Sequence, residues 1–125
     1  MQHSSLVSFL NGDKLPDELW QEIEAEVTEC VTAASKPGSV GHVIITEGPN
    51  TIIDRRHVDV LVNGLADGTL PVQAAAYVAD ALIMSDDFNF ADEGVLEVLF
   101  FLSDESAPLS REEVQALQSR LSTGL

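Results

Sequence analysis

The segment Asp86-Asp87-Phe88-Asn89-Phe90-Ala91-Asp92 gathers the oxygen-bearing side chains that hard cations such as Ca²⁺ prefer. Counted as a calcium loop from Asp87, it departs from the required pattern at three positions. Ala91 takes the fifth position, Asp92 stands where the glycine of the sharp turn belongs, and Val98 replaces the bidentate glutamate. These mismatches argue against calcium binding. Helix capping and a solvated loop between helices explain the segment better.

Other residue types that could do chemistry are equally isolated. His57 and Asp59 are close in sequence, but the chain has only three histidines and no cysteine near them, so no metal-ligand spacing appears. Cys30 is the only cysteine and falls in an amphipathic pattern, which predicts a buried, unreactive thiol. No serine occurs in a Gly-x-Ser-x-Gly turn. We therefore expect no catalytic site, no metal and no cofactor.

The charge pattern is the strongest functional signal. Between Val58 and Ser110 there is no Lys or Arg, and the carboxylates in that stretch are Asp59, Asp67, Asp80, Asp86, Asp87, Asp92, Glu93, Glu97, Asp104 and Glu105. The whole chain has a formal net charge of −15. Such a field attracts cationic partners and disfavours phosphate backbones and anionic lipids. We expect a basic protein partner, not nucleic acid or a membrane.

Length and composition predict one folded domain over residues 1–125. A chain of 125 residues can bury one hydrophobic core, and 45% hydrophobic residues is a normal level for a globular protein. The longest apolar run, Val98 to Leu102, is far shorter than the roughly 20 residues that span a bilayer. With a single cysteine no intramolecular disulfide can form, so a reducing compartment fits best. We expect a cytoplasmic protein.

Three helices are predicted in the first two thirds of the chain. The first begins at Leu15-Pro16 and ends at Lys36-Pro37-Gly38, since proline suits a first helical position. Its apolar stripe comprises Leu15, Leu19, Ile23, Val27, Cys30 or Val31, and Ala34, with Trp20 beside it. The second runs from Asp54 to Ala66 and stops at Asp67-Gly68. The third starts at Thr69-Leu70-Pro71, with Thr69 as its cap, and buries Val72, Ala75, Ala76, Ala79, Leu82 and Ile83.

The isoleucine-rich segment near residues 42–54 has two interpretations. His42 to Thr46 and Thr51 to Ile53 could form a short β-hairpin with a four-residue loop. Alternatively, its isoleucines could fill the helical core from an irregular connection, because an isolated two-stranded ribbon is weak without packing support. Either interpretation makes the segment structural.

Two further helices complete the predicted fold. One begins at Asn89 or its neighbour, and its run from Val95 to Leu102 leaves almost no polar face, which is typical of a central core helix. Ser110 and Glu113 match a capping box before a closing helix with Val114, Leu117 and Leu121 in its stripe. The fold class is therefore mainly α, a compact bundle of about five helices.

Two sequence stretches and the acidic segment that follows them carry a family resemblance. They are Leu61-Val62-Asn63-Gly64-Leu65-Ala66-Asp67-Gly68-Thr69-Leu70-Pro71, then Ala75-Ala76-Tyr77-Val78-Ala79-Asp80-Ala81-Leu82, and the acidic residues through Glu105. In these the chain resembles small helical immunity proteins of bacterial toxin systems. The resemblance implies a cytoplasmic protein that binds a cognate toxin, such as a nuclease, and masks its basic active-site surface.

The predicted partner-binding residues combine the acidic field with nearby aromatic residues. They are Asp86, Asp87, Phe88, Phe90, Asp92, Glu93, Asp104 and Glu105, with Tyr77 as a further aromatic candidate. Exposed aromatic residues are enriched at binding hot spots, although each of these could equally belong to the core. Two other functions stay open: an acidic secretion chaperone or adaptor, which needs a substantial antiparallel sheet, and a small carboxylate-dependent enzyme, which no motif requires.

Overall fold

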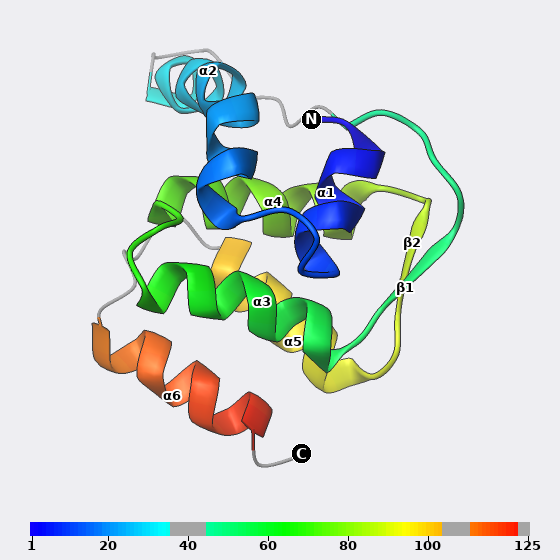
Figure 1. Ribbon diagram of the computed structural model, residues 1–125, viewed down its shortest axis with the longest axis vertical. Coiled ribbons are helices and arrows are strands. Elements are labelled where there is room, and N and C mark those ends of the chain that lie inside the picture. The colour runs from blue at the N-terminus through cyan, green and yellow to red at the C-terminus, as the bar shows by residue number, and fades with distance from the viewer. Residues whose placement is uncertain (36–44, 104–110, 123–125) are drawn as a thin grey trace.

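The computed structural model describes residues 1–35, 45–103 and 111–122, and these residues are mainly helical (Figure 1). The elements in chain order are α1 (His3–Leu10), α2 (Pro16–Ser35), β1 (Thr51–Ile53), α3 (Arg55–Ala66), α4 (Val72–Met84), β2 (Phe88–Phe90), α5 (Glu93–Ser103) and α6 (Arg111–Ser122). The predicted mainly α fold is confirmed. The described residues contain six helices where about five were expected, and α1 is the one that was not predicted.

Helix α4 is largely buried between other helices. It packs against α2, α3 and α5, and Figure 1 shows it crossing the middle of the molecule. Its buried residues are Ala74, Ala75, Ala76, Tyr77, Val78, Ala79, Ala81 and Leu82. The sequence predicted α5 as the central core helix, which is wrong because α5 exposes Phe100 and Phe101. Small side chains let neighbouring helices approach α4 from several directions, so alanine content marks the centre here better than hydrophobicity does.

Helix α1 covers one end of the core with a short apolar stripe. Leu6, Phe9 and Leu10 are buried, at the spacing of one helical face, and His3 continues that face by one turn. The helix packs against α2 and α3. With only two turns it carries a weak sequence pattern, and it depends on tertiary packing.

Helix α2 follows its predicted course within the described residues. Pro16 opens it, acidic residues occupy its first turn, and Leu19, Ile23 and Val27 are buried. Leu15 was expected in the stripe but is exposed, because it precedes the helix. Lys36-Pro37-Gly38, the predicted end, lies outside the described residues, as do the surroundings of the Val31 and Ala34 side chains.

Helix α3 has the boundaries that the sequence predicted. The Asp54 side chain accepts a hydrogen bond from the His57 backbone N–H, and His57 Nδ1 accepts one from the Asp54 backbone N–H, which makes a reciprocal cap. Gly68, at φ +74°, takes the left-handed conformation that ends the helix.

The start of α4 differs from the predicted one. Pro71 occupies the cap position and no side chain caps the helix, whereas the Thr69 hydroxyl donates back to the Gly64 carbonyl. The predicted Thr69 cap is therefore wrong. Val72 is also exposed instead of buried, since the first turn of α4 leaves the core.

The two strands form a parallel pair, with Thr51 opposite Phe88 and Ile53 opposite Phe90. The Thr51 N–H donates to the Asp87 carbonyl, and the Ala91 N–H donates to the Ile53 carbonyl. This pairing corrects the predicted hairpin: β1 exists, but its partner is β2, and residues 45–50 form no strand. Residues 42–44 lie outside the described part. Each strand leads directly into a helix, β1 into α3 and β2 into α5, so the pair fixes where both helices begin.

Helix α5 begins at Glu93, not at Asn89, because residues 88–90 are taken up by β2. The Asp92 side chain accepts a hydrogen bond from the Val95 N–H at 3.0 Å, which makes Asp92 the cap. Val95, Val98, Leu99 and Leu102 are buried. Helix α6 packs on α3, and Val114 and Leu117 of its predicted stripe are buried. Ser110 of the predicted capping box and the Leu121 side chain are outside the described part.

A close contact joins the start of α1 to the strand pair. The His3 ring stacks on Phe88 with a centroid separation of 4.8 Å and an interplanar angle of 11°, and both side chains are buried. Gly48 lies directly against this ring, so a Cβ added at Gly48 would come within 2.3 Å of His3 Cγ. The His3 backbone N–H also donates to Thr46 Oγ1. Position 48 therefore has room only for glycine.

We predict that Gly48→Ala lowers the free energy of unfolding by about 1–3 kcal/mol, because the new methyl group displaces a buried ring. Urea denaturation followed by circular dichroism measures the change. The matched control is Gly48→Ala in a His3→Ala background, where the methyl group has room and its cost should fall below about 1 kcal/mol. An equal cost in both backgrounds would show that the His3 contact is not what excludes alanine.

Candidate functional site

Four predicted site residues lie in the α4–β2 connection and in β2, and the structure divides them between surface and core. Asp86 is exposed. Asp87 is half-buried, and its carboxylate accepts a hydrogen bond from the Gly48 N–H at 3.1 Å, so it holds two loops together. Phe88 is 4% exposed, and Phe90 is half-buried against the core. Phe88 and Tyr77 are therefore core residues and not exposed aromatic anchors.

Two of the remaining predicted site residues, Asp92 and Glu93, lie at the start of α5. Asp92 caps the helix, and its other oxygen is 3.5 Å from Arg55 Nε. Glu93 is exposed in the first turn. Asp104 and Glu105 lie outside the described residues. Among the predicted acidic residues that the structure describes, Asp86 and Glu93 are exposed, and their side chains make no hydrogen bond or ion pair.

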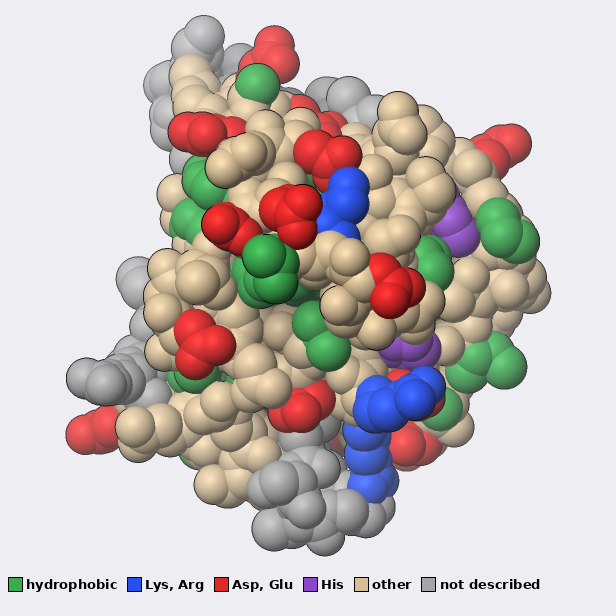
Figure 2. Space-filling model, in the orientation of Figure 1, with side chains coloured by type: hydrophobic (Ala, Val, Ile, Leu, Met, Phe, Trp, Pro, Cys, Tyr) green, Lys and Arg blue, Asp and Glu red, His purple; other side chains and the backbone are tan. Residues whose placement is uncertain are grey.

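Carboxylates and cations adjoin on the face seen in Figure 2, where red and blue side chains touch. Lys14 Nζ is 2.7 Å from Glu22 Oε2, and Arg56 Nη2 is 3.7 Å from Asp54 Oδ2. Arg55 and Arg56 both pair with nearby acids, Arg55 with Asp92 and Arg56 with Asp54. Helices α4 and α5 and the chain between them contain no Lys or Arg at all.

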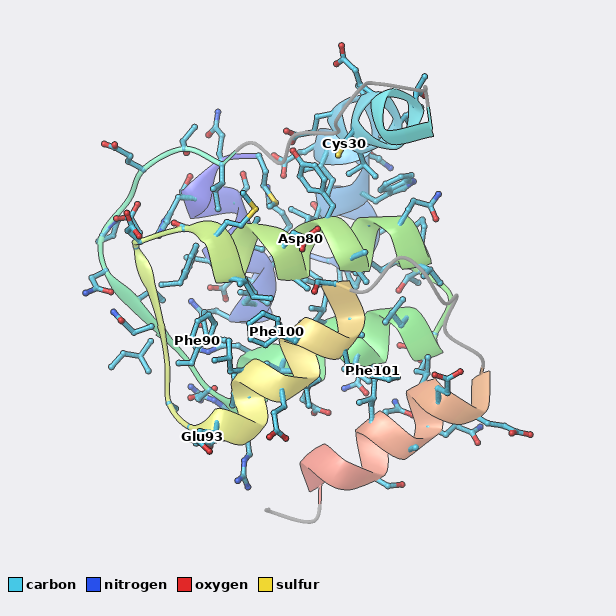
Figure 3. All side chains as sticks on the ribbon, turned by 180° about the vertical axis from the view of Figure 1, so that it is seen from behind. Cys30, Asp80, Phe90, Glu93, Phe100 and Phe101 are labelled. Carbon is cyan, nitrogen blue, oxygen red and sulfur yellow. The ribbon has the colours of Figure 1, made fainter. Side chains whose placement is uncertain are left out.

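Helix α5 exposes one side, which we call the α5 outer face and define as Glu93, Glu97, Phe100 and Phe101. Phe100 is 54% exposed and Phe101 is 44% exposed, and both glutamates are exposed. At about 100° per residue, Glu93 and Glu97 follow each other along the middle of this face, with Phe100 on one side and Phe101 on the other. Figure 3 shows the two phenylalanines on the two flanks of this face, Phe100 toward Phe90 and Phe101 toward α6.

This face was missed at the level of sequence because α5 is almost uniformly apolar. Its buried residues, Val95, Val98, Leu99 and Leu102, already complete a stripe at the spacing of one helical face. Phe100 and Phe101 fall outside that stripe, and this offset was the signal that could have identified them. Aromatic residues are enriched at protein–protein interfaces, so the two adjacent exposed phenylalanines make this face the candidate site.

A hollow of about 210 Å³ lies between the end of α1 and the start of α3, lined by Leu10, Asn11, Arg56, His57, Asp59 and Val60. It is smaller than the ligand pockets of roughly 300–1,000 Å³ that proteins usually form. Both ring nitrogens of His57 are engaged, Nδ1 by the Asp54 backbone and Nε2 by Asn11 Oδ1 at 3.0 Å. The hollow contains one carboxylate, Asp59. Its histidine serves as a helix cap.

Within the residues that the structure describes, no three His, Cys, Asp or Glu side chains gather so as to hold a metal ion. Cys30 is half-buried and packs against the core. None of the described helices is both long enough and apolar enough to cross a bilayer.

Comparison with known proteins gives no relative: no protein-family model, curated protein or solved structure matches the chain.

Because Asp92 both caps α5 and contacts Arg55, its first role is to hold the helix that carries the α5 outer face. We predict that Asp92→Ala lowers the free energy of unfolding by about 1 kcal/mol, whereas Asp92→Asn, which keeps a capping oxygen, costs less. Thermal and urea unfolding measure both. Asp86→Ala is the control and should stay within about 0.5 kcal/mol of wild type. If the alanine and asparagine variants lowered the free energy of unfolding equally, capping would not be the role of Asp92.

Proposed function

We propose that this chain is a protein-binding immunity protein, which neutralises a cognate toxin with a basic surface by covering that surface with the α5 outer face. The supporting observation is that Phe100 and Phe101 are exposed beside Glu93 and Glu97 on a helix without a basic residue. Carboxylates on such a face accelerate encounter with a cationic partner, and the apolar rings then slow dissociation once water is excluded. The complex would form in the cytoplasm, where the toxin threatens its producer.

The distribution of charge favours a cationic protein as the occupant of this face. With a net charge of −15, the chain repels nucleic acids and anionic membranes at long range. At the start of α5, Arg55 forms an ion pair with Asp92. Glu93 and Glu97 are exposed on the same helix and add negative charge to this surface. A basic active-site cleft, such as that of a nuclease, has the complementary charge.

The fold supports binding by a rigid helix over the secretion-chaperone alternative. That alternative calls for a substantial antiparallel sheet, whereas the sheet in the described residues has two parallel strands of three residues each. The buried stripe of α5 packs on α4 and α3 and fixes the orientation of the exposed side. A preformed surface loses little conformational entropy on binding, which favours tight masking of a partner.

The first experiment is an affinity capture from the lysate of the organism that encodes the chain, with wild type and the Phe100→Ala/Phe101→Ala double variant as parallel baits. We expect wild type to retain a basic protein at low salt and the variant to lose it. Met84→Ala, which truncates a 66% exposed side chain at the end of α4, is the matched control and should retain it. The captured protein should arrest growth when expressed alone, and co-expression of wild type should restore growth. Equal capture by all three baits, or a captured protein without toxicity, contradicts the proposal.

Electrostatic steering gives a kinetic prediction for the captured partner. Glu93→Lys/Glu97→Lys should lower the association rate constant at low salt by about tenfold or more, and the difference should shrink as salt screens the charges. Glu24→Lys/Glu29→Lys on α2 changes the net charge by the same amount and should have a smaller effect. Stopped-flow fluorescence measures both. Equal slowing by the two variants would mean that net charge, not the α5 outer face, governs association.

A further inference from the structure

Glu97 has an aromatic side chain on either side one helical turn later. Phe100 stands at the i+3 position and Phe101 at the i+4 position, and side chains at these spacings are neighbours on a helix, with Cβ atoms roughly 5–6 Å apart. The rings are about half exposed, at 54% and 44%, so each presents part of its surface to a ligand. The arrangement places one carboxylate between two accessible aromatic rings.

We propose that Glu97, Phe100 and Phe101 form a recognition site for an arginine side chain of the partner protein; this inference rests on the proposed function and specifies its central contact. A guanidinium group is planar, so it can donate two parallel hydrogen bonds to a carboxylate while its flat face lies against an aromatic ring. The site offers a carboxylate and an aromatic ring within one helical turn. Glu93 lies one turn before Glu97 on the same side of α5 and adds negative charge. No exposed aromatic ring of α5 lies beside Glu93.

The same geometry discriminates arginine from lysine. The ammonium group of lysine is a compact and strongly hydrated charge, so it interacts with Glu97 but gains less from a half-exposed ring. Cation–π contacts at exposed sites also involve arginine more often than lysine. The site should therefore prefer an arginine-bearing segment to a lysine-bearing segment of equal charge, and the preference should depend on the rings and not on the carboxylate.

The test uses the full chain and two synthetic probes, N-acetylated and C-amidated nona-arginine and nona-lysine peptides. Isothermal titration at low salt should give an affinity for the arginine peptide about two- to fivefold higher than for the lysine peptide. NMR should show the Cδ protons of bound arginine shifted upfield by the ring currents of Phe100 and Phe101. The Phe100→Leu/Phe101→Leu variant keeps apolar bulk without a π face, and it should bind both peptides equally. Glu97→Gln should weaken both peptides and keep some preference for arginine.

The outcomes separate this inference from the function on which it rests. Equal binding of the two peptides by wild type, lost in Glu93→Lys/Glu97→Lys, would overturn arginine recognition and leave a cation-binding face intact. A preference for arginine that persists in the leucine variant would place its origin elsewhere on the chain and also overturn the inference. Failure of wild type to bind either peptide at low salt would overturn the cationic-partner proposal itself.

Discussion

The close packing of neighbouring helices on α4 is the constraint on which the rest of the structure depends. Five of its eight buried residues are alanines, so α2, α3 and α5 can approach its backbone closely. Tyr77 is the large exception, and its hydroxyl donates to Glu26 Oε2 on α2 at 3.0 Å, which gives the polar end of a buried ring a partner. Enlarging any of these alanines would push a neighbouring helix outward. The position of α5, and so the direction of its outer face, follows from the size of side chains on α4.

Local signals in the sequence predicted α2 and α3 well because each helix carries its own boundary chemistry. Pro16 opens α2, and Asp54 with Gly68 encloses α3. These residues act through backbone hydrogen bonds and dihedral angles within a few positions, so no knowledge of the tertiary fold is needed to interpret them. Helix α1 lacks such signals and was missed, since its two turns are held by burial of Leu6 and Phe9 against distant segments.

The features that escaped prediction depend on contacts between residues far apart in the chain. Strand β1 pairs with residues 88–90, which lie beyond two intervening helices, and three residues such as Phe88-Asn89-Phe90 have no period long enough to indicate a strand. The candidate site shows the same limit. Hydrophobicity placed Phe100 and Phe101 in the core, whereas packing on α4 admits only one side of α5. The acidic character of the site was foreseen, but its aromatic members were sought in the preceding loop, where Phe88 is buried on His3.

The carboxylates of the described residues include some that hold the backbone and others that lie exposed on α5. Asp54, Asp87 and Asp92 accept hydrogen bonds from backbone N–H groups, so their charge stabilises helix starts and a loop contact. Glu93 and Glu97 stand on the exposed side of α5, where mutual repulsion at i,i+4 spacing costs some helix stability. The adjoining phenylalanines add a second cost, since apolar surface stays in contact with water. In the proposed complex, the cations of a basic partner would lie beside these carboxylates while its surface buries the rings.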